Sequence, residues 1–82
     1  MNGNICVVNA TNFLITEIEC EANLLGMITE LAIPGGNIAQ GQMTIVKFDR
    51  DACSSIFYVE TSNHQLFKFN KGINIYNVLI VN

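Results

Sequence analysis

The chain is poor in basic residues and in charged residues of any kind. Its 82 residues include four Lys or Arg and seven Asp or Glu, so its net charge is −3 and 13% of it is charged. The basic residues, Lys47, Arg50, Lys68 and Lys71, form no run. Binding to phosphates needs clustered Lys and Arg, so the composition argues against nucleic acid and against an anionic membrane surface as partners.

Histidine, tryptophan and long apolar runs are also scarce. His64 is the only histidine, and there is no tryptophan. A zinc centre would need this histidine together with scattered cysteines, and a Cys–His nucleophile pair needs a third, orienting group. We therefore expect no metal, no cofactor and no enzymatic activity. No apolar run approaches the roughly 20 residues that span a bilayer, so no membrane span is expected.

The three cysteines, Cys6, Cys20 and Cys53, are an odd number without metal-type spacing. No basic residue precedes an apolar stretch at the N-terminus, which does not resemble a signal peptide. We expect a reduced, cytoplasmic setting; the open alternative is a trimmed, secreted chain with one disulfide and one free thiol. Asn9-Ala10-Thr11 matches the glycosylation sequon, which we expect to be idle without a secretory signal.

Apolar residues are abundant for so short a chain. Half of the residues are hydrophobic, and a chain of this length forms one domain, residues 1–82, with a modest core. Either a dense sheet core or burial against another chain can remove these hydrophobic side chains from water. Because a large exposed apolar patch is otherwise a liability, we favour self-association or a protein partner.

The first half of the chain predicts β-strands separated by polar turns. Residues 5–8 and 13–22 are β-forming and flank the polar cluster 9–12, so we predict a β-hairpin. The second segment alternates: Leu14, Ile18, Cys20 and Ala22 are predicted to point inward, and Glu17, Glu19 and Glu21 outward. Residues 23–33 fit either a short helix near 23–31 or a strand, and Pro34-Gly35-Gly36 ends that segment.

The second half is more regular. We predict strands over 42–48, 55–61, 66–69 and 73–81, with turns at 49–51, 62–65 and 70–72. Residues 55–61 and 66–69 read as a hairpin, and 73–81 is apolar on both faces, as expected of a central or interface strand. The fold class is therefore all-β, a small antiparallel β-sandwich or open barrel of six to seven strands.

A pattern-level resemblance accompanies this prediction. The order VVNATNFLITEI, LAIPGG, GQMTIVKF and ACSSIFYV, over residues 7–59, resembles small uncharacterised bacterial β-sandwich domains. Those domains open with a strand, an Asn-x-Thr turn and a second strand, followed by a Pro-Gly loop. The position after the threonine, commonly glycine in that group, is Asn12 here. The resemblance implies a sandwich and implies no activity.

These patterns predict a non-enzymatic interaction module that binds itself or a protein partner through an apolar sheet face or a strand edge. The candidate partner-binding residues are the acidic stripe Glu17, Glu19 and Glu21, and Ile73, Ile75 and Tyr76 of the last strand. The alternative is a small ligand-binding protein, lectin-like or lipid-binding, that uses the 23–41 loops and the aromatic strands. The aromatic residues themselves are expected in the core.

Overall fold

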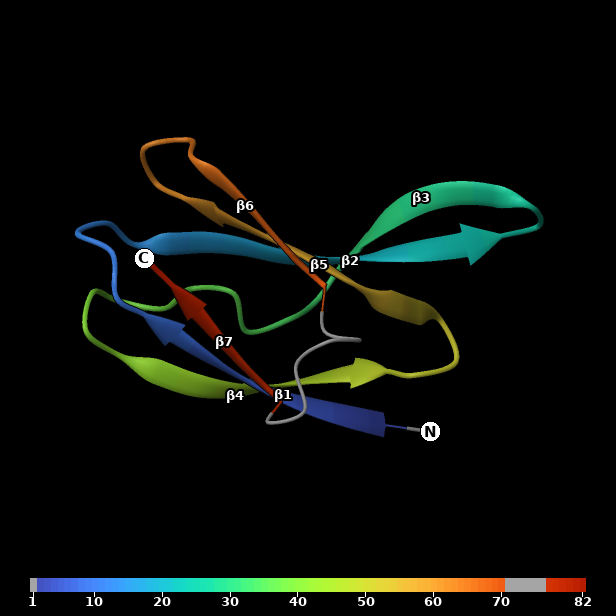
Figure 1. Ribbon diagram of the computed structural model, residues 1–82, viewed down its shortest axis with the longest axis horizontal. Helices are drawn as coiled ribbons and strands as arrows, with labels where there is room; N and C mark the ends of the chain where they lie inside the picture. The colour runs from blue at the N-terminus through green and yellow to red at the C-terminus, as the bar shows by residue number, and fades with distance from the viewer. Residues whose placement is uncertain (1, 71–76) are drawn as a thin grey trace.

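The computed structural model describes residues 2–70 and 77–82, and the described residues form two sheets of β-strands without any helix (Figure 1). A three-stranded sheet has the order β4-β1-β7, and a four-stranded sheet has the order β3-β2-β5-β6. The strands are β1 (Asn2–Asn9), β2 (Ile15–Leu24), β3 (Met27–Ala32), β4 (Met43–Asp49), β5 (Cys53–Thr61), β6 (Leu66–Asn70) and β7 (Val78–Val81). The all-β prediction of six to seven strands is confirmed.

The predicted hairpin between the first two strands is wrong. β1 lies in the three-stranded sheet, antiparallel to β4 and parallel to β7, whereas β2 pairs with β3 and β5 in the other sheet. The inner side chains of both strands, Ile5 and Val7 of β1 and Ile15, Ile18 and Cys20 of β2, belong to one buried core. Because the strands lie in different sheets, these side chains meet in the layer between the two sheets. The predicted hairpin of β5 and β6 is confirmed, with Phe57 opposite Phe69.

A buried asparagine holds the crossing from β1 to β2. Asn9 is inaccessible to solvent, and its amide nitrogen donates to the Phe13 carbonyl at 2.7 Å and to the Ile38 carbonyl at 2.9 Å. Its Oδ1 accepts from the backbone N–H and the hydroxyl of Thr11, at 3.0 and 2.7 Å. These bonds satisfy the whole side chain. The nitrogen that a glycan would need is therefore committed inside the fold.

The predicted alternation in β2 is correct from Ile18 onward but wrong at its start. Ile15 is fully buried, and Leu14 is 41% exposed. A register shift between Ile15 and Glu17 in the pairing with β5 moves the inward face by one residue. An extra residue of this kind is the signature of a β-bulge, which simple period-two counting cannot anticipate.

Residues 23–33 form the second arm of a hairpin, so the helix alternative is wrong and the strand alternative is correct. β3 pairs antiparallel with β2, and the closing pair is Leu24 with Met27. The two residues between them, Leu25 and Gly26, have φ of 53° and 83°. Positive φ at both positions is the two-residue turn that matches strand twist, which ends any helical continuation.

The core lies between the sheets and is apolar. The fully buried side chains of largest volume include Phe57, Ile5, Ile15, Ile18 and Leu79. The rings of Phe48 and Phe57 meet edge to face at a centroid distance of 5.0 Å. Phe67 and Phe69 pack partly buried against this core, as expected of strand aromatics.

A disulfide joins Cys20 of β2 to Cys53 of β5, with a Cα–Cα distance of 5.5 Å, and Cys6 is a free cysteine. Of the two cysteine arrangements that the sequence left open, the structure has the one with a single disulfide. Nowhere in the described part of the chain is there a helix long and apolar enough to cross a membrane.

Candidate interaction surfaces

The outer side of the three-stranded sheet is apolar. Its inner side supplies the core, so alternation turns a second set of apolar side chains outward: Cys6 and Val8 of β1, Met43 and Ile45 of β4, and Val78 and Ile80 of β7. We call this set the apolar face. The register makes it continuous, because Val8 lies beside both Met43 and Ile80, and Cys6 beside both Ile45 and Val78.

Much of the apolar face is open to solvent. Met43 is 67% exposed, Ile45 68% and Ile80 55%. The Cys6 sulfur lies near its centre, 4.0 Å from the Met43 sulfur. Polar residues begin only toward the start of β1, where Asn4 lies opposite Lys47. Single exposed apolar residues are ordinary, but a contiguous exposed set drawn from all strands of a sheet is a candidate interaction surface.

The outer side of the four-stranded sheet is acidic. The predicted stripe of Glu17, Glu19 and Glu21 does share one face, and the fold adds two glutamates that the sequence reading missed. Glu30 of β3 lies opposite Glu21, and Glu60 of β5 lies opposite Glu17. We call these residues the acidic face. No local sequence pattern could predict that Glu30 and Glu60 lie beside the stripe, because only the pairing of β2 with β3 and β5 brings them there.

The acidic face perturbs its own ionisation. Partial burial, followed by the charges of Glu30, Glu17 and Glu60, raises the pKa of Glu19. The Tyr58 hydroxyl donates to Glu21 Oε2 at 3.0 Å, and this bond is the main reason that the pKa of Tyr58 is raised. Lys68 lies across from Tyr58 on β6 and brings positive charge to this side of the sheet. Burial and the neighbouring carboxylates therefore favour the protonated form of the Glu19 side chain.

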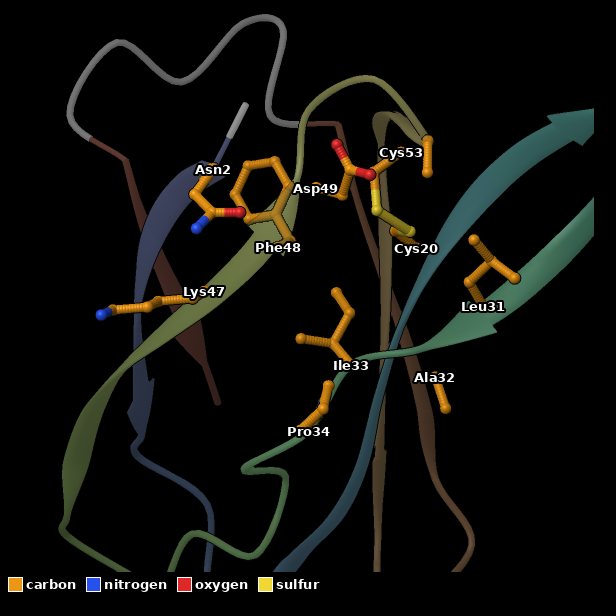
Figure 2. Close-up of a pocket in the computed structure, with 11 residues that line it drawn as sticks. Asn2, Cys20, Leu31, Ala32, Ile33, Pro34, Lys47, Phe48, Asp49 and Cys53 are labelled. Atoms are coloured by element: carbon orange, nitrogen blue, oxygen red, sulfur yellow. A yellow bond between two sulfur atoms is a disulfide. The ribbon is translucent and has the colours of Figure 1, made fainter.

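A cavity of about 270 Å³ opens at the flank of the sandwich, where the edge strands β3 and β4 face each other (Figure 2). The disulfide and the side chains of Leu31, Ile33, Pro34 and Phe48 line it, and Lys47 points away from its centre. It is slightly smaller than the roughly 300–1,000 Å³ of ordinary small-molecule sites. Most of its lining residues are apolar, and Asn2, Lys47 and Asp49 add polar groups to it.

The tip of the β2–β3 hairpin is exposed and apolar, and it projects beyond the rest of the sandwich (Figure 1). Leu24 is 50% exposed, Met27 and Ile28 72% each, and Leu25 is fully exposed. The sequence analysis predicted either a short helix or a strand for the segment that contains these residues, and it predicted no turn within it. The signal that could have located the tip is the Leu25-Gly26 pair as a two-residue turn.

The remaining predicted site residues are placed as follows. Ile73, Ile75 and Tyr76 lie outside the described residues, although the last strand does contribute Val78 and Ile80 to the apolar face. His64 is exposed in the turn between β5 and β6, with φ of 64°. Within residues 2–70 and 77–82, no three His, Cys, Asp or Glu side chains are grouped so that they could hold a metal ion.

No protein-family model, no curated protein and no solved structure matches this chain. The features of the described residues that bear on function are the apolar face, the acidic face, the flank cavity and the hairpin tip.

Proposed function

We propose that this chain is a non-enzymatic assembly module that binds a second copy of itself through the apolar face. The observation that carries the proposal is the continuous set of outward apolar side chains from β1, β4 and β7, most exposed at Met43, Ile45 and Ile80. Burial of apolar surface is the main driving force of association, at about 25 cal/mol per Å². Packing two such faces together removes both from water.

The distribution of charge favours a second copy on this face. The glutamates of the acidic face lie on the opposite side of the molecule, on the outer side of the other sheet. When two copies join through their apolar faces, the two acidic faces point away from each other. Their separation then exceeds the Debye length of about 8 Å at physiological salt, so their repulsion is screened.

The contact is isologous, since the same surface is used by both copies. Two packed sheets lie about 10 Å apart with their strands roughly aligned. Cys6 lies near the centre of the apolar face, between Ile45 and Val78 in the register. In the dimer the two Cys6 thiols therefore come close to the two-fold axis, where a short thiol-reactive cross-linker joins them.

Sedimentation velocity tests the proposal with two matched substitutions. Ile45→Glu places a charge in the apolar face, and Leu66→Glu places the same charge at a similarly exposed strand residue, 61% exposed, outside that face. We expect association over about 1 µM to 1 mM, a range that corresponds to about −8 to −4 kcal/mol. Ile45→Glu should lower the associated mass and abolish Cys6 cross-linking, and Leu66→Glu should do neither. Equal behaviour of the two variants would refute the proposal.

The flank cavity favours a second candidate function, binding of a small apolar or lipid-like ligand. Leu31, Ile33, Pro34 and Phe48 offer an apolar lining at the open side of the sandwich. Titration with a fluorescent fatty acid tests this candidate. Binding that persists in Ile45→Glu and is lost in Ile33→Trp, which fills the cavity, would support it; no saturable binding would remove it.

A further inference from the structure

Strand β3 is the least protected edge among the described strands. It has β2 on one side and no described strand on the other. The edge strands β4 and β6 carry lysines, Lys47 and Lys68, and β7 has only four residues. β3 has six residues, of which Glu30 is the only charged one. Natural proteins usually block such an edge with Lys, Pro, a bulge or a cover, because an open edge pairs with another strand.

The hydrogen-bond ladder shows which backbone groups of β3 face outward. The Ile33 N–H donates to the Ile18 carbonyl at 2.8 Å. An antiparallel ladder repeats every second residue, so Leu31 and Thr29 also direct their N–H and C=O groups to β2. Ile28, Glu30 and Ala32 direct theirs to the open edge. The edge therefore offers a row of donors and acceptors at alternate residues.

The hairpin tip combines an unfavourable backbone conformation with an exposed apolar side chain. Two-residue turns of this type favour Asn-Gly or Asp-Gly, because Asn and Asp tolerate positive φ. Leu25 occupies the left-handed region, which costs a residue with a Cβ roughly 1–2 kcal/mol, and its side chain is fully exposed. Apart from its two chain neighbours, no described residue comes within 4 Å of where a Cβ at Gly26 would lie, so the tip borders open space.

We propose that β3 pairs antiparallel with β3 of a second copy, about a two-fold axis through Thr29. This inference uses a different surface from the apolar face and goes beyond the proposed function. It would extend the four-stranded sheet of each copy into one continuous sheet, the geometry of β-augmentation. The open edge supplies the hydrogen bonds, and the exposed side chains of Met27 and Ile28 supply apolar area.

The choice of axis follows from register and charge. Residues with outward-facing backbone groups must meet each other, so Ile28, Glu30 and Ala32 can pair only among even-numbered positions. An axis through Glu30 would set two glutamates directly opposite each other, which is destabilising. An axis through Ile28 would pair only residues 27–29 of the two strands. The axis through Thr29 pairs Ile28 with Glu30 and Met27 with Leu31.

The same axis brings the apolar tip of each copy to the flank cavity of the other. Leu25 then lies opposite Ile33 of the second copy, and Ile33 lines the cavity. The tip precedes β3 and the cavity follows it, at opposite ends of one strand (Figures 1 and 2). A two-fold axis across β3 makes every contact occur twice, so the tip of the first copy meets the cavity of the second and the tip of the second copy meets the cavity of the first. In this dimer, Leu25 of each copy would occupy the flank cavity of the other copy.

The edge can be blocked without damage to the fold of one copy. Proline at position 28 removes an N–H that faces the open edge and leaves the ladder to β2 intact. Leu25→Asn removes the most exposed apolar side chain of the tip and suits the turn better, so it should raise the stability of the folded chain. Unfolding in urea checks that both variants fold. A reduction in their association then reports the contact and not a failure to fold.

Sedimentation of five proteins, the wild type, three single variants and one double variant, separates the two interfaces. With both contacts the wild type should form an assembly larger than a dimer, because two different two-fold contacts on one chain link dimers to one another. Ile45→Glu should leave a dimer through β3, Ile28→Pro a dimer through the apolar face, and the double variant a monomer. If Ile28→Pro and Leu25→Asn both match the wild type, the β3 contact is overturned even where Ile45→Glu still lowers the mass.

Cysteine cross-linking tests the axis directly. In the Cys6→Ser background, Thr29→Cys places two thiols opposite each other, at a Cα separation of about 4.5 Å, within the range that a disulfide spans. We expect an intermolecular disulfide on mild oxidation, seen on a non-reducing gel. Leu66→Cys in the same background is the matched control. Equal cross-linking of the two would overturn the axis through Thr29.

Discussion

Glu21 of β2 lies directly opposite Glu30 of β3. The β2–β3 hairpin, which carries the apolar tip, therefore has two like charges on neighbouring positions of its paired strands. Glu17 and Glu60 form a second such pair between β2 and β5. Like charges directly opposite each other in a sheet are unfavourable. The acidic face is therefore a surface that the fold tolerates at some cost to stability.

Removing one charge of the Glu21–Glu30 pair should stabilise the fold. We expect Glu30→Gln to raise the free energy of unfolding by about 0.2–1 kcal/mol, the scale of a cross-strand pair, measured by urea denaturation at low salt. Salt screens this repulsion, so the gain should shrink at about 1 M salt, where the Debye length is about 3 Å. A gain that does not change with salt would contradict the electrostatic explanation.

Stability should depend on pH through Glu19. Its pKa is raised in the folded chain by burial and by Glu30, Glu17 and Glu60, so the folded state binds this proton more tightly than the unfolded state. The contribution is fully present below the unfolded pKa of about 4.3 and is lost as pH rises through the folded pKa. We expect Glu19→Gln to flatten the fall in stability across this window and to be more stable than the wild type at pH 7. A pH profile of urea unfolding measures both, and identical profiles would refute the assignment.

The Cys20–Cys53 disulfide should contribute substantially to stability. The bond closes a loop with a sequence separation of 33, and loop-closure entropy for that length corresponds to about 3–4 kcal/mol. Cys20→Ala with Cys53→Ala should lose about this amount in guanidinium unfolding, and a reductant should affect the wild type similarly. Cys6→Ser is the control and should change stability little. Peptide mapping that links Cys6 to either partner would contradict the pairing.

Asn9 should be one of the least replaceable polar residues. Asn9→Asp removes the amide donors to Phe13 and Ile38 and points a carboxylate at two carbonyl oxygens. Leaving buried groups unpaired costs about 1–3 kcal/mol each, so we expect a loss of several kcal/mol or failure to fold. Asn12→Asp is the matched control, since Asn12 is exposed and accepts one bond from Gln40 at 3.4 Å. Thermal unfolding compares them, and similar losses would show that the Asn9 bonds contribute little.

Much of the local structure followed from short-range patterns. β4, β5 and β6 were predicted within about two residues, because alternating apolar residues and turn-forming residues bound each of them. Alternation alone places Glu17, Glu19 and Glu21 on the outer face of their strand, and it places Met43 and Ile45 on one face of theirs, but only the structure shows that this second face points outward. The start of β2 was predicted one residue out of phase, because a bulge depends on the partner strand.

The surfaces that support the proposals could be predicted only in part. Alternation makes Met43 and Ile45 neighbours in one strand, but Cys6 and Ile80 join them only through the pairing of β1 with β4 and β7. Glu30 and Glu60 join the acidic stripe for the same reason. The hairpin tip was missed because Leu25 lacks the residue type that usually marks such a turn.

By itself, the sequence determined that the chain is all-β, that one face of most strands is buried, and that charge is scarce. Alternation and turn chemistry act over a few residues and are visible in one chain segment. Only the tertiary structure decided that β1 and β2 lie in different sheets, that Cys20 bonds to Cys53, and that β3 is left as an open edge. Those outcomes depend on which strands share a core, and that choice is made by contacts between residues far apart in the chain.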